Sequence, residues 1–228
     1  MKSGYFLTCS IFLIALITAG CAVNKAIPVH GLGKKAPGQT QNLIECISNQ
    51  YPDQFNALNN VGLNIRGKTI TLKGFLKVNR PKGEIRLIAQ GDMGGTLFEI
   101  HILKGQPDTI SAKGFFKEAW LEKSVVKDLK HLYLVPSFNA PNVYTDQNGQ
   151  MILADSKDSG TASHIFKAED TGELQVSEYR LVKENLLEYT IAYGYDPGAV
   201  LPGFITIKDR NLNYTLNINV RYMIPRTQ

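Results

Sequence analysis

Apolar and polar residues alternate with a period of two from Leu63 onward, and this alternation predicts a meander of antiparallel strands. The first run is "KTITLKGFLKVN", where Ile70, Leu72, Leu76 and Val78 share one face. "EIRLIA" and "TLFEIHIL" follow with the same alternation. The turn sequences "PKGE" and "QGDMGG" separate the three runs, so each neighbouring pair is predicted to form a hairpin.

Two segments have the period of a helix instead. The pattern of residues 43–58 predicts a short amphipathic helix, and it is compatible both with a continuous helix and with one interrupted at Pro52. Residues 115–133 predict one helix of about five turns. Its apolar stripe repeats at steps of three and four residues and comprises Leu121, Val125, Leu129 and Leu132.

The rest of the chain divides into a turn-rich part and four further strands. Residues 135–173 have weak periodicity and predict one hairpin, around Asn148-Gly149. The predicted strands then cover 173–182, 185–194, 203–209 and 213–224. In total the pattern predicts a mainly β (α+β) fold of about eight to ten strands. The helices should lie on one face of a single curved antiparallel sheet.

The amino-terminal segment has the pattern of an export signal. Lys2 is followed by an uncharged run from Tyr5 to Ala19, which is shorter than the roughly 20 residues of a spanning helix. This length disfavours the alternative of an uncleaved membrane anchor.

The exit from this run, Thr18-Ala19-Gly20-Cys21, resembles the bacterial lipobox. The resemblance implies cleavage before Cys21, which would carry an N-acyl chain (palmitate) and an S-diacylglycerol. It implies no other cofactor. The next residue is Ala22 and not the aspartate typical of inner-membrane retention, so the implied location is the periplasmic face of the outer membrane.

The organisation is therefore a signal peptide (1–20), a Gly/Pro/Lys-rich flexible tether (21–39) and one domain (40–228). The net charge of +5 is scattered along the chain, so a nucleic-acid partner is not expected. Cys46 would be the one cysteine left after lipidation of Cys21, and its helical surroundings predict a buried thiol.

Familiar catalytic motifs are not found in the sequence, which favours binding or structural work over catalysis. His30, His101, His131 and His164 do not stand at metal-ligand spacing. Ser159 lies outside any G-x-S-x-G context. The carboxylates of the turn-rich part are expected to be solvated surface groups: Asp155, Asp158, Glu169, Asp170 and Glu173.

The order of elements resembles the LolA/LolB-like group of periplasmic proteins, and related lipoproteins of that fold, over most of residues 56–222. "GEIRLIAQGDMGGTLFEIHI" and "LPGFITIKDRNLNYTLNINVRY" carry the resemblance most closely, and Met93 is the candidate for an apolar loop tip. The resemblance implies an incomplete β-barrel whose concave face is covered by helices and whose interior accepts acyl chains of membrane lipids or lipoproteins. The implied ligand-binding residues are a lid (Phe115, Phe116, Trp120, Leu121, Val125) and a floor (Phe98, Ile100, Leu216, Ile218).

Three hypotheses follow from these observations. The first is an outer-membrane-anchored, non-catalytic lipoprotein that binds or carries a lipid or acylated ligand. The second is a structural lipoprotein that meets an envelope protein partner through residues 135–173. The third, an envelope hydrolase, is disfavoured by the missing motifs.

Overall fold

The computed structural model describes residues 38–157, 160–168 and 172–226. The predicted signal peptide, the lipidation of Cys21 and nearly all of the predicted tether lie outside these residues. Within them, no helix has the length and apolar character needed to cross a membrane.

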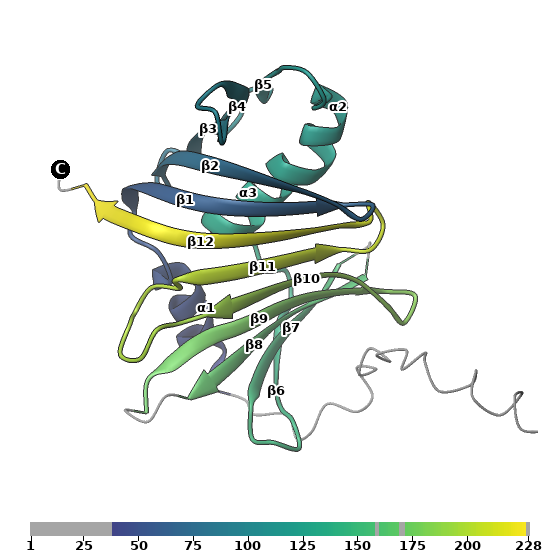
Figure 1. The fold of residues 1–228 in the computed structure, drawn as a ribbon. Coiled ribbons are helices and arrows are strands. Elements are labelled where there is room, and N and C mark those ends of the chain that lie inside the picture. Colours follow the sequence, from purple (N-terminus) through teal and green to yellow (C-terminus); the bar gives the residue numbers. More distant parts are fainter. Residues whose placement is uncertain (1–37, 158–159, 169–171, 227–228) are drawn as a thin grey trace, which may run out of the picture.

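Twelve strands form one antiparallel sheet that does not close on itself (Figure 1). The order across the sheet is β5-β4-β3-β2-β1-β12-β11-β10-β9-β8-β7-β6. Neighbours in the sheet are therefore neighbours in sequence, except that the first strand pairs with the last, and β5 and β6 form the two edges. The strands are β1 (Gln54–Ile65), β2 (Lys68–Asn79), β3 (Glu84–Gly91), β4 (Thr96–Leu103), β5 (Thr109–Ala112), β6 (Asn142–Thr145), β7 (Met151–Lys157), β8 (Gly160–Ala168), β9 (Leu174–Lys183), β10 (Leu186–Gly194), β11 (Phe204–Asp209) and β12 (Tyr214–Pro225).

The alternation in β2, β3 and β4 puts every second side chain on the concave face, as predicted. Leu76 pairs with Leu87, and Leu87 pairs with Ile100, so these buried residues form one row across three strands. The register of β1 against β12 shifts between Leu58 and Asn59. Such a bulge increases the local twist and bends the strand, which contributes to the curvature of the sheet.

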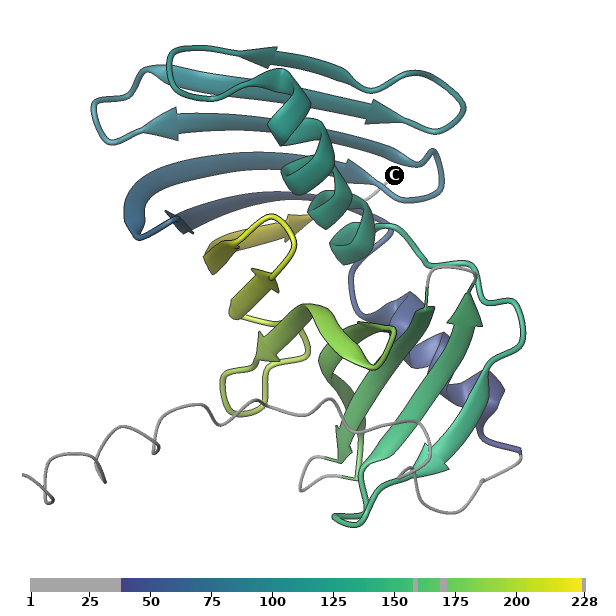
Figure 2. The ribbon, with the colours of Figure 1, turned by 90° about the vertical axis from the view of Figure 1, so that its right-hand side faces the viewer.

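A long helix crosses the concave face of the first half of the sheet (Figure 2). It consists of α2 (Glu118–Leu121), a π-helical turn η2 (Glu122–Val126) and α3 (Lys127–Tyr133). The hydroxyl of Ser124 in this turn donates to the carbonyl of Trp120 at 2.7 Å. The predicted helix is therefore present, with a π turn that the periodicity did not predict.

The amino-terminal helix α1 (Thr40–Asn49) is shorter than predicted. The prediction of a helix over 43–58 was wrong beyond Asn49, since β1 begins at Gln54. Pro52 accounts for the difference because the residue before a proline, here Tyr51, disfavours the helical conformation.

The turn-rich segment contains more structure than predicted. β6 and β7 form the hairpin expected at Asn148-Gly149. β8 is an additional strand that the weak periodicity of 135–173 did not predict. These three strands extend the sheet under α1.

Two hydrophobic clusters make up the core. The larger lies between the α2–α3 helix and the strands beneath it, and the smaller holds Leu43 and Ile47 of α1 against β6 to β9. All buried members of both clusters fall between Leu43 and Ile218. A chain that begins at residue 22 therefore retains the whole described core.

Candidate ligand cavity

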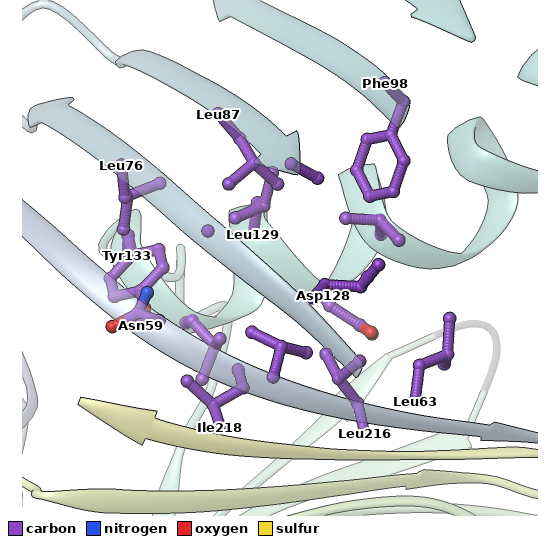
Figure 3. Close-up of a pocket in the computed structure, with 16 residues that line it drawn as sticks. Asn59, Leu63, Leu76, Leu87, Phe98, Asp128, Leu129, Tyr133, Leu216 and Ile218 are labelled. Carbon is purple, nitrogen blue, oxygen red and sulfur yellow. The ribbon is translucent and has the colours of Figure 1, made fainter. Parts of the chain in front are cut away.

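A cavity of about 50 Å³ lies between the helix and the concave face of the sheet (Figure 3). η2 and α3 form its roof, and β1 to β4 with β12 form its floor. The lining is apolar apart from a few side chains: Asn59, Val61, Leu63, Leu72, Gly74, Leu76, Leu87, Ala89, Phe98, Val125, Asp128, Leu129, Leu132, Tyr133, Leu216 and Ile218.

The cavity is small for a lipid site. Pockets that enclose small organic ligands have volumes of about 300–1,000 Å³, whereas about 10–15 Å³ holds one water-sized group. The protein's own side chains therefore fill most of the space under the helix. A ligand larger than a few heavy atoms enters only if the helix moves.

The predicted ligand-binding residues divide into three groups. Phe98, Val125, Leu216 and Ile218 line the cavity. Ile100, Phe116 and Leu121 are buried in the same cluster without lining it. Trp120 is partly buried, and Phe115 is 64% exposed at the start of the helix. The structure thus brings eight of the nine into the cluster between helix and sheet and leaves Phe115 outside it.

A chain of aromatic contacts holds the start of the helix against the sheet. The ring centroids of Phe98 and Phe116 are 5.0 Å apart, and those of Phe116 and Trp120 are 6.3 Å apart. Trp120 then reaches Tyr214 of β12 at 5.8 Å. These contacts are apolar and adaptable, so they oppose displacement of the helix less rigidly than hydrogen bonds with fixed geometry would.

Asp128 is a buried carboxylate in the roof of the cavity, with 1% of its surface exposed. It accepts hydrogen bonds from the hydroxyls of Tyr189 (2.7 Å) and Tyr214 (2.8 Å). Burial raises the pKa of Asp128 to about 7 even though both hydrogen bonds act to lower it. Beside it, Lys127 forms an ion pair with Asp209 of β11. Polar groups therefore tie the middle of the helix to β10, β11 and β12.

Arg80 ties down the far end of the helix. Its Nε donates to the carbonyl of Tyr133 at 3.1 Å, and its Nη1 donates to the carbonyls of Ser48 and Tyr51 at 2.5 and 2.7 Å. Arg80 follows the end of β2. Its guanidinium group thus bonds the last turn of α3, the last turn of α1 and the chain just after α1.

Asn59 is the polar residue of the cavity floor. It is 4% exposed, and its Oδ1 has no hydrogen-bond partner among the described residues. Its cross-strand partner is Gly74, which also lines the cavity. A Cβ at Gly74 would lie 3.5 Å from Leu87 Cδ1 and 3.8 Å from Asn59 Cβ, which is ordinary contact. A methyl group therefore fits at this position without displacing a neighbour.

The Gly74→Ala variant is expected to raise the free energy of unfolding by about 1 kcal/mol, because a methyl group fills part of the cavity and the unfolded chain loses freedom. Urea denaturation measures the change. Gly62→Ala is the matched control, since a Cβ there meets nothing within 4 Å and tests only the effect on the unfolded chain. If Gly74→Ala and Gly62→Ala change the free energy of unfolding by the same amount, the added methyl group at position 74 does not fill part of the cavity.

One carboxylate that was predicted to be solvated is buried instead. Asp155, predicted as solvated, is 1% exposed and accepts the backbone N–H groups of Asn139 (3.1 Å) and Ala140 (3.0 Å). The reason is that β7 places it on the concave face, which the turn-rich prediction did not foresee. Asp158, Glu169 and Asp170 lie outside the described residues.

Asp155 also borders a second, wider pocket of about 210 Å³, on the other side of α3. Its walls include Lys130, Phe138, His164 and Tyr179. Among the described residues, no group of three or more His, Cys, Asp or Glu side chains could hold a metal ion.

Cys46 is half-buried in α1, and its Sγ donates to the carbonyl of Leu174 at 3.2 Å. Burial raises the pKa of the thiol. It is therefore a packed thiol that is less reactive than a free one, in line with the predicted structural role.

Asn59 and Asp128 were not singled out by the sequence analysis, although each left a signal. Asn59 occupies an inward position between Ala57 and Val61, where alternation calls for an apolar residue. Asp128 lies within the apolar stripe of the helix, between Val125 and Leu132. A polar residue in an apolar row is the pattern that marks a buried polar group.

Comparisons with known proteins support the fold. Neither a protein-family model nor a curated protein matches the chain. A domain from Vibrio parahaemolyticus, described as an outer membrane lipoprotein-sorting protein, is similar in structure with a TM-score of 0.50 and 11% sequence identity, over 82% of this chain and 94% of that one. A DUF1329 family protein from Desulfovibrio piger has a TM-score of 0.50 and 10% identity, over 82% of this chain and 92% of that one. At these identities the likeness shows that the chain shares the overall fold of these two proteins.

Proposed function

We propose that this protein is a non-catalytic carrier or acceptor for a lipid or acylated molecule. The observation that carries the proposal is the small apolar cavity between the helix and the curved, open sheet. The structural likeness to a domain described as lipoprotein-sorting supports it. We further propose that Cys21 anchors the protein by its acyl groups at the periplasmic face of the outer membrane.

In this proposal the helix from Glu118 to Tyr133 acts as a lid. It is joined to the sheet by the segments 113–117 and 134–141, which belong to no helix or strand, so in this proposal it swings outward without loss of strand pairing. The apolar surfaces exposed by that movement would be covered by the acyl chain. Each methylene removed from water contributes about 0.8 kcal/mol, so part of one chain provides useful affinity.

The direct test uses native mass spectrometry of residues 22–228 isolated from cells. We expect a population with additional mass that corresponds to a lipid, and saturable uptake of a fluorescent fatty acid. A clean apo mass together with no uptake would contradict the proposal.

The Cys21→Ala variant tests the proposed anchor. We expect an unprocessed precursor without acyl groups, because the residue that receives the diacylglycerol is lost. Fractionation of the envelope and intact-mass analysis measure the outcome. Processed, membrane-bound variant protein would contradict lipidation at Cys21.

The small volume of the closed cavity favours a second candidate, a structural lipoprotein of an envelope assembly. In that case the interior stays closed and the surface formed by residues 135–173, with β6 to β8, meets a protein partner. Photo-crosslinking from this surface in cells separates the two candidates. One dominant protein adduct favours assembly, whereas phospholipid adducts favour lipid carriage.

A further inference from the structure

A pocket of about 320 Å³ lies where two hairpin turns meet, and it shares no lining residue with the apolar cavity. The β1–β2 turn contains Arg66 and Gly67, and the β11–β12 turn covers residues 210–213. The turns are neighbours because β1 pairs with β12, with Ile65 opposite Tyr214, and they lie together at the right-hand end of the sheet in Figure 1. The pocket is open to solvent, and its lining comprises Asn64, Arg66, Gly67, Lys208, Asp209, Arg210, Asn213, Tyr214 and Thr215.

The charges in this lining are three cations and one carboxylate. Asp209 is 3% exposed and already has partners, because it forms an ion pair with Lys127 and accepts a backbone N–H group at 2.8 Å. Arg66, Lys208 and Arg210 are exposed, and none of them has an ion-pair partner within the part of the chain that the structure describes. The pocket therefore holds positive charge that the protein itself does not neutralise.

The kinds of donor in the lining match a phosphate group. A guanidinium group presents paired N–H donors that suit two oxygens of a phosphate, and a lysine adds a point charge. Asn213 contributes a side-chain amide and Thr215 a hydroxyl, both of which donate to oxygen. A carboxylate has only two oxygens and engages fewer of these groups. Pockets for small organic ligands begin at about 300 Å³, so a phosphate with a small organic substituent has room here.

Arg66 is an unusual residue for its position in the β1–β2 turn. Its φ is 51°, in the left-handed region, and Gly67 follows with a φ of 80°. Two-residue hairpin turns of this kind prefer asparagine, aspartate or glycine at the first position, because a longer side chain is strained in the left-handed conformation. Turn formation alone therefore does not favour arginine here, whereas a charge at the rim of the pocket does.

We infer that this pocket binds a phosphate group through Arg66, Lys208 and Arg210. The inference goes beyond the proposed function, because it requires no acyl chain in the apolar cavity. Two sources supply this chemistry, namely the headgroup of a membrane phospholipid and a free phosphate or phosphate ester.

Two binding experiments on residues 22–228 test the inference and separate the sources. Calorimetric titration with inorganic phosphate and with glycerol 3-phosphate, at constant ionic strength, measures binding of the free ligands. Co-sedimentation with vesicles of phosphatidylcholine, alone and mixed with phosphatidic acid, measures binding of a headgroup. We expect saturable binding in at least one of the two experiments. Binding to the phosphatidic acid vesicles identifies a headgroup as the source, and binding of glycerol 3-phosphate without vesicle binding identifies a soluble ester.

Arg66→Asn and Arg210→Gln are each expected to weaken this binding about fivefold, as the loss of one exposed charge contact allows. Arg66→Asn should keep the fold, because it places a preferred turn residue before Gly67, and its urea midpoint should be no lower than that of the unaltered chain. Lys82→Gln is the matched control. It removes one exposed positive charge from the β2–β3 turn, outside the pocket, and should leave phosphate binding unchanged.

The absence of saturable binding to the unaltered chain in both experiments overturns the inference. Equal weakening by Lys82→Gln and the two arginine variants also overturns it, since that result shows attraction to net charge and not to this pocket. Uptake of a fluorescent fatty acid is measured on the same chains and should be unaffected by Arg66→Asn. The proposed function depends on that uptake and not on phosphate binding, so the failure of one is distinguishable from the failure of the other.

Discussion

Replacing Arg80 with methionine is expected to lower the free energy of unfolding by about 3 kcal/mol. The guanidinium group donates to the carbonyls of Ser48 in α1, Tyr51 just after α1, and Tyr133 at the end of α3. Methionine keeps much of the apolar stem but leaves three carbonyls without this donor. Because the site is half-buried, water replaces only part of what is lost.

Chemical denaturation of residues 22–228 measures this change, with Arg86→Met as the matched control. Arg86 is an exposed arginine of the neighbouring strand β3, and its ion pair is with Glu84 at 2.9 Å. Exposed ion pairs contribute about 0–1 kcal/mol, so the control should be close to the unaltered chain. Equal losses in the two variants would show that Arg80 does not join the helices to the sheet.

The strands were predictable wherever one face of the sheet is buried and the other meets solvent. In β3, buried Ile85 and Leu87 alternate with Arg86. The alternation within the strand therefore indicates which side chains face the core and which face solvent. The closing strand β12 follows the same rule from Tyr214 to Ile218. These local patterns, with glycine-containing turns between them, define the meander without knowledge of the tertiary structure.

The errors occurred where burial is two-sided or where a boundary depends on a single residue. In β8, Ile165 and Phe166 are adjacent and both buried, since the register shifts between them. This shift breaks the alternation, and the strand was missed. In residues 43–58 the apolar positions of α1 run into those of β1, and Pro52 is the one local sign of the change.

The cavity itself could not be predicted, because the residues that line it have the same apolar character as those that fill the core. Phe98 lines the cavity and Ile100 does not, although they occupy equivalent inward positions on β4. Whether space remains between side chains depends on the distance of the helix from the sheet, which no sequence pattern records. Polar residues in apolar rows, such as Asn59 and Asp128, do mark the site in the sequence, but the sequence analysis did not use them.

Asp128 makes the stability of the fold depend on pH. Its pKa rises from the ordinary value of 3.8 to about 7 in the folded protein, because burial disfavours the charged form. Below pH 4 the group is protonated in both states and has no effect. Between about pH 4 and pH 7 the unfolded chain releases the proton while the folded chain retains it, so the free energy of unfolding falls as the pH rises.

Replacing Asp128 with asparagine is therefore expected to remove this contribution. The difference between the two pKa values corresponds to about 4 kcal/mol, so relative to the unaltered chain the variant should gain about that much stability from pH 4 to pH 8. Denaturation of both chains at each pH unit measures the gain. Groups that titrate equally in both chains cancel in the comparison.

Glu99→Gln controls for the change in net charge, because Glu99 is exposed on β4. Parallel pH profiles for Asp128→Asn and the unaltered chain would contradict a buried carboxylate with a raised pKa.

The ionisation of Asp128 is also expected to affect ligand entry, because Asp128 lies on the proposed lid helix and accepts hydrogen bonds from Tyr189 and Tyr214 of the sheet. An ionised carboxylate regains its hydration when the helix lifts, whereas a protonated one gains little. Uptake of a fluorescent fatty acid should therefore be faster at pH 8 than at pH 5.5 in the unaltered chain, and this difference should vanish in Asp128→Asn.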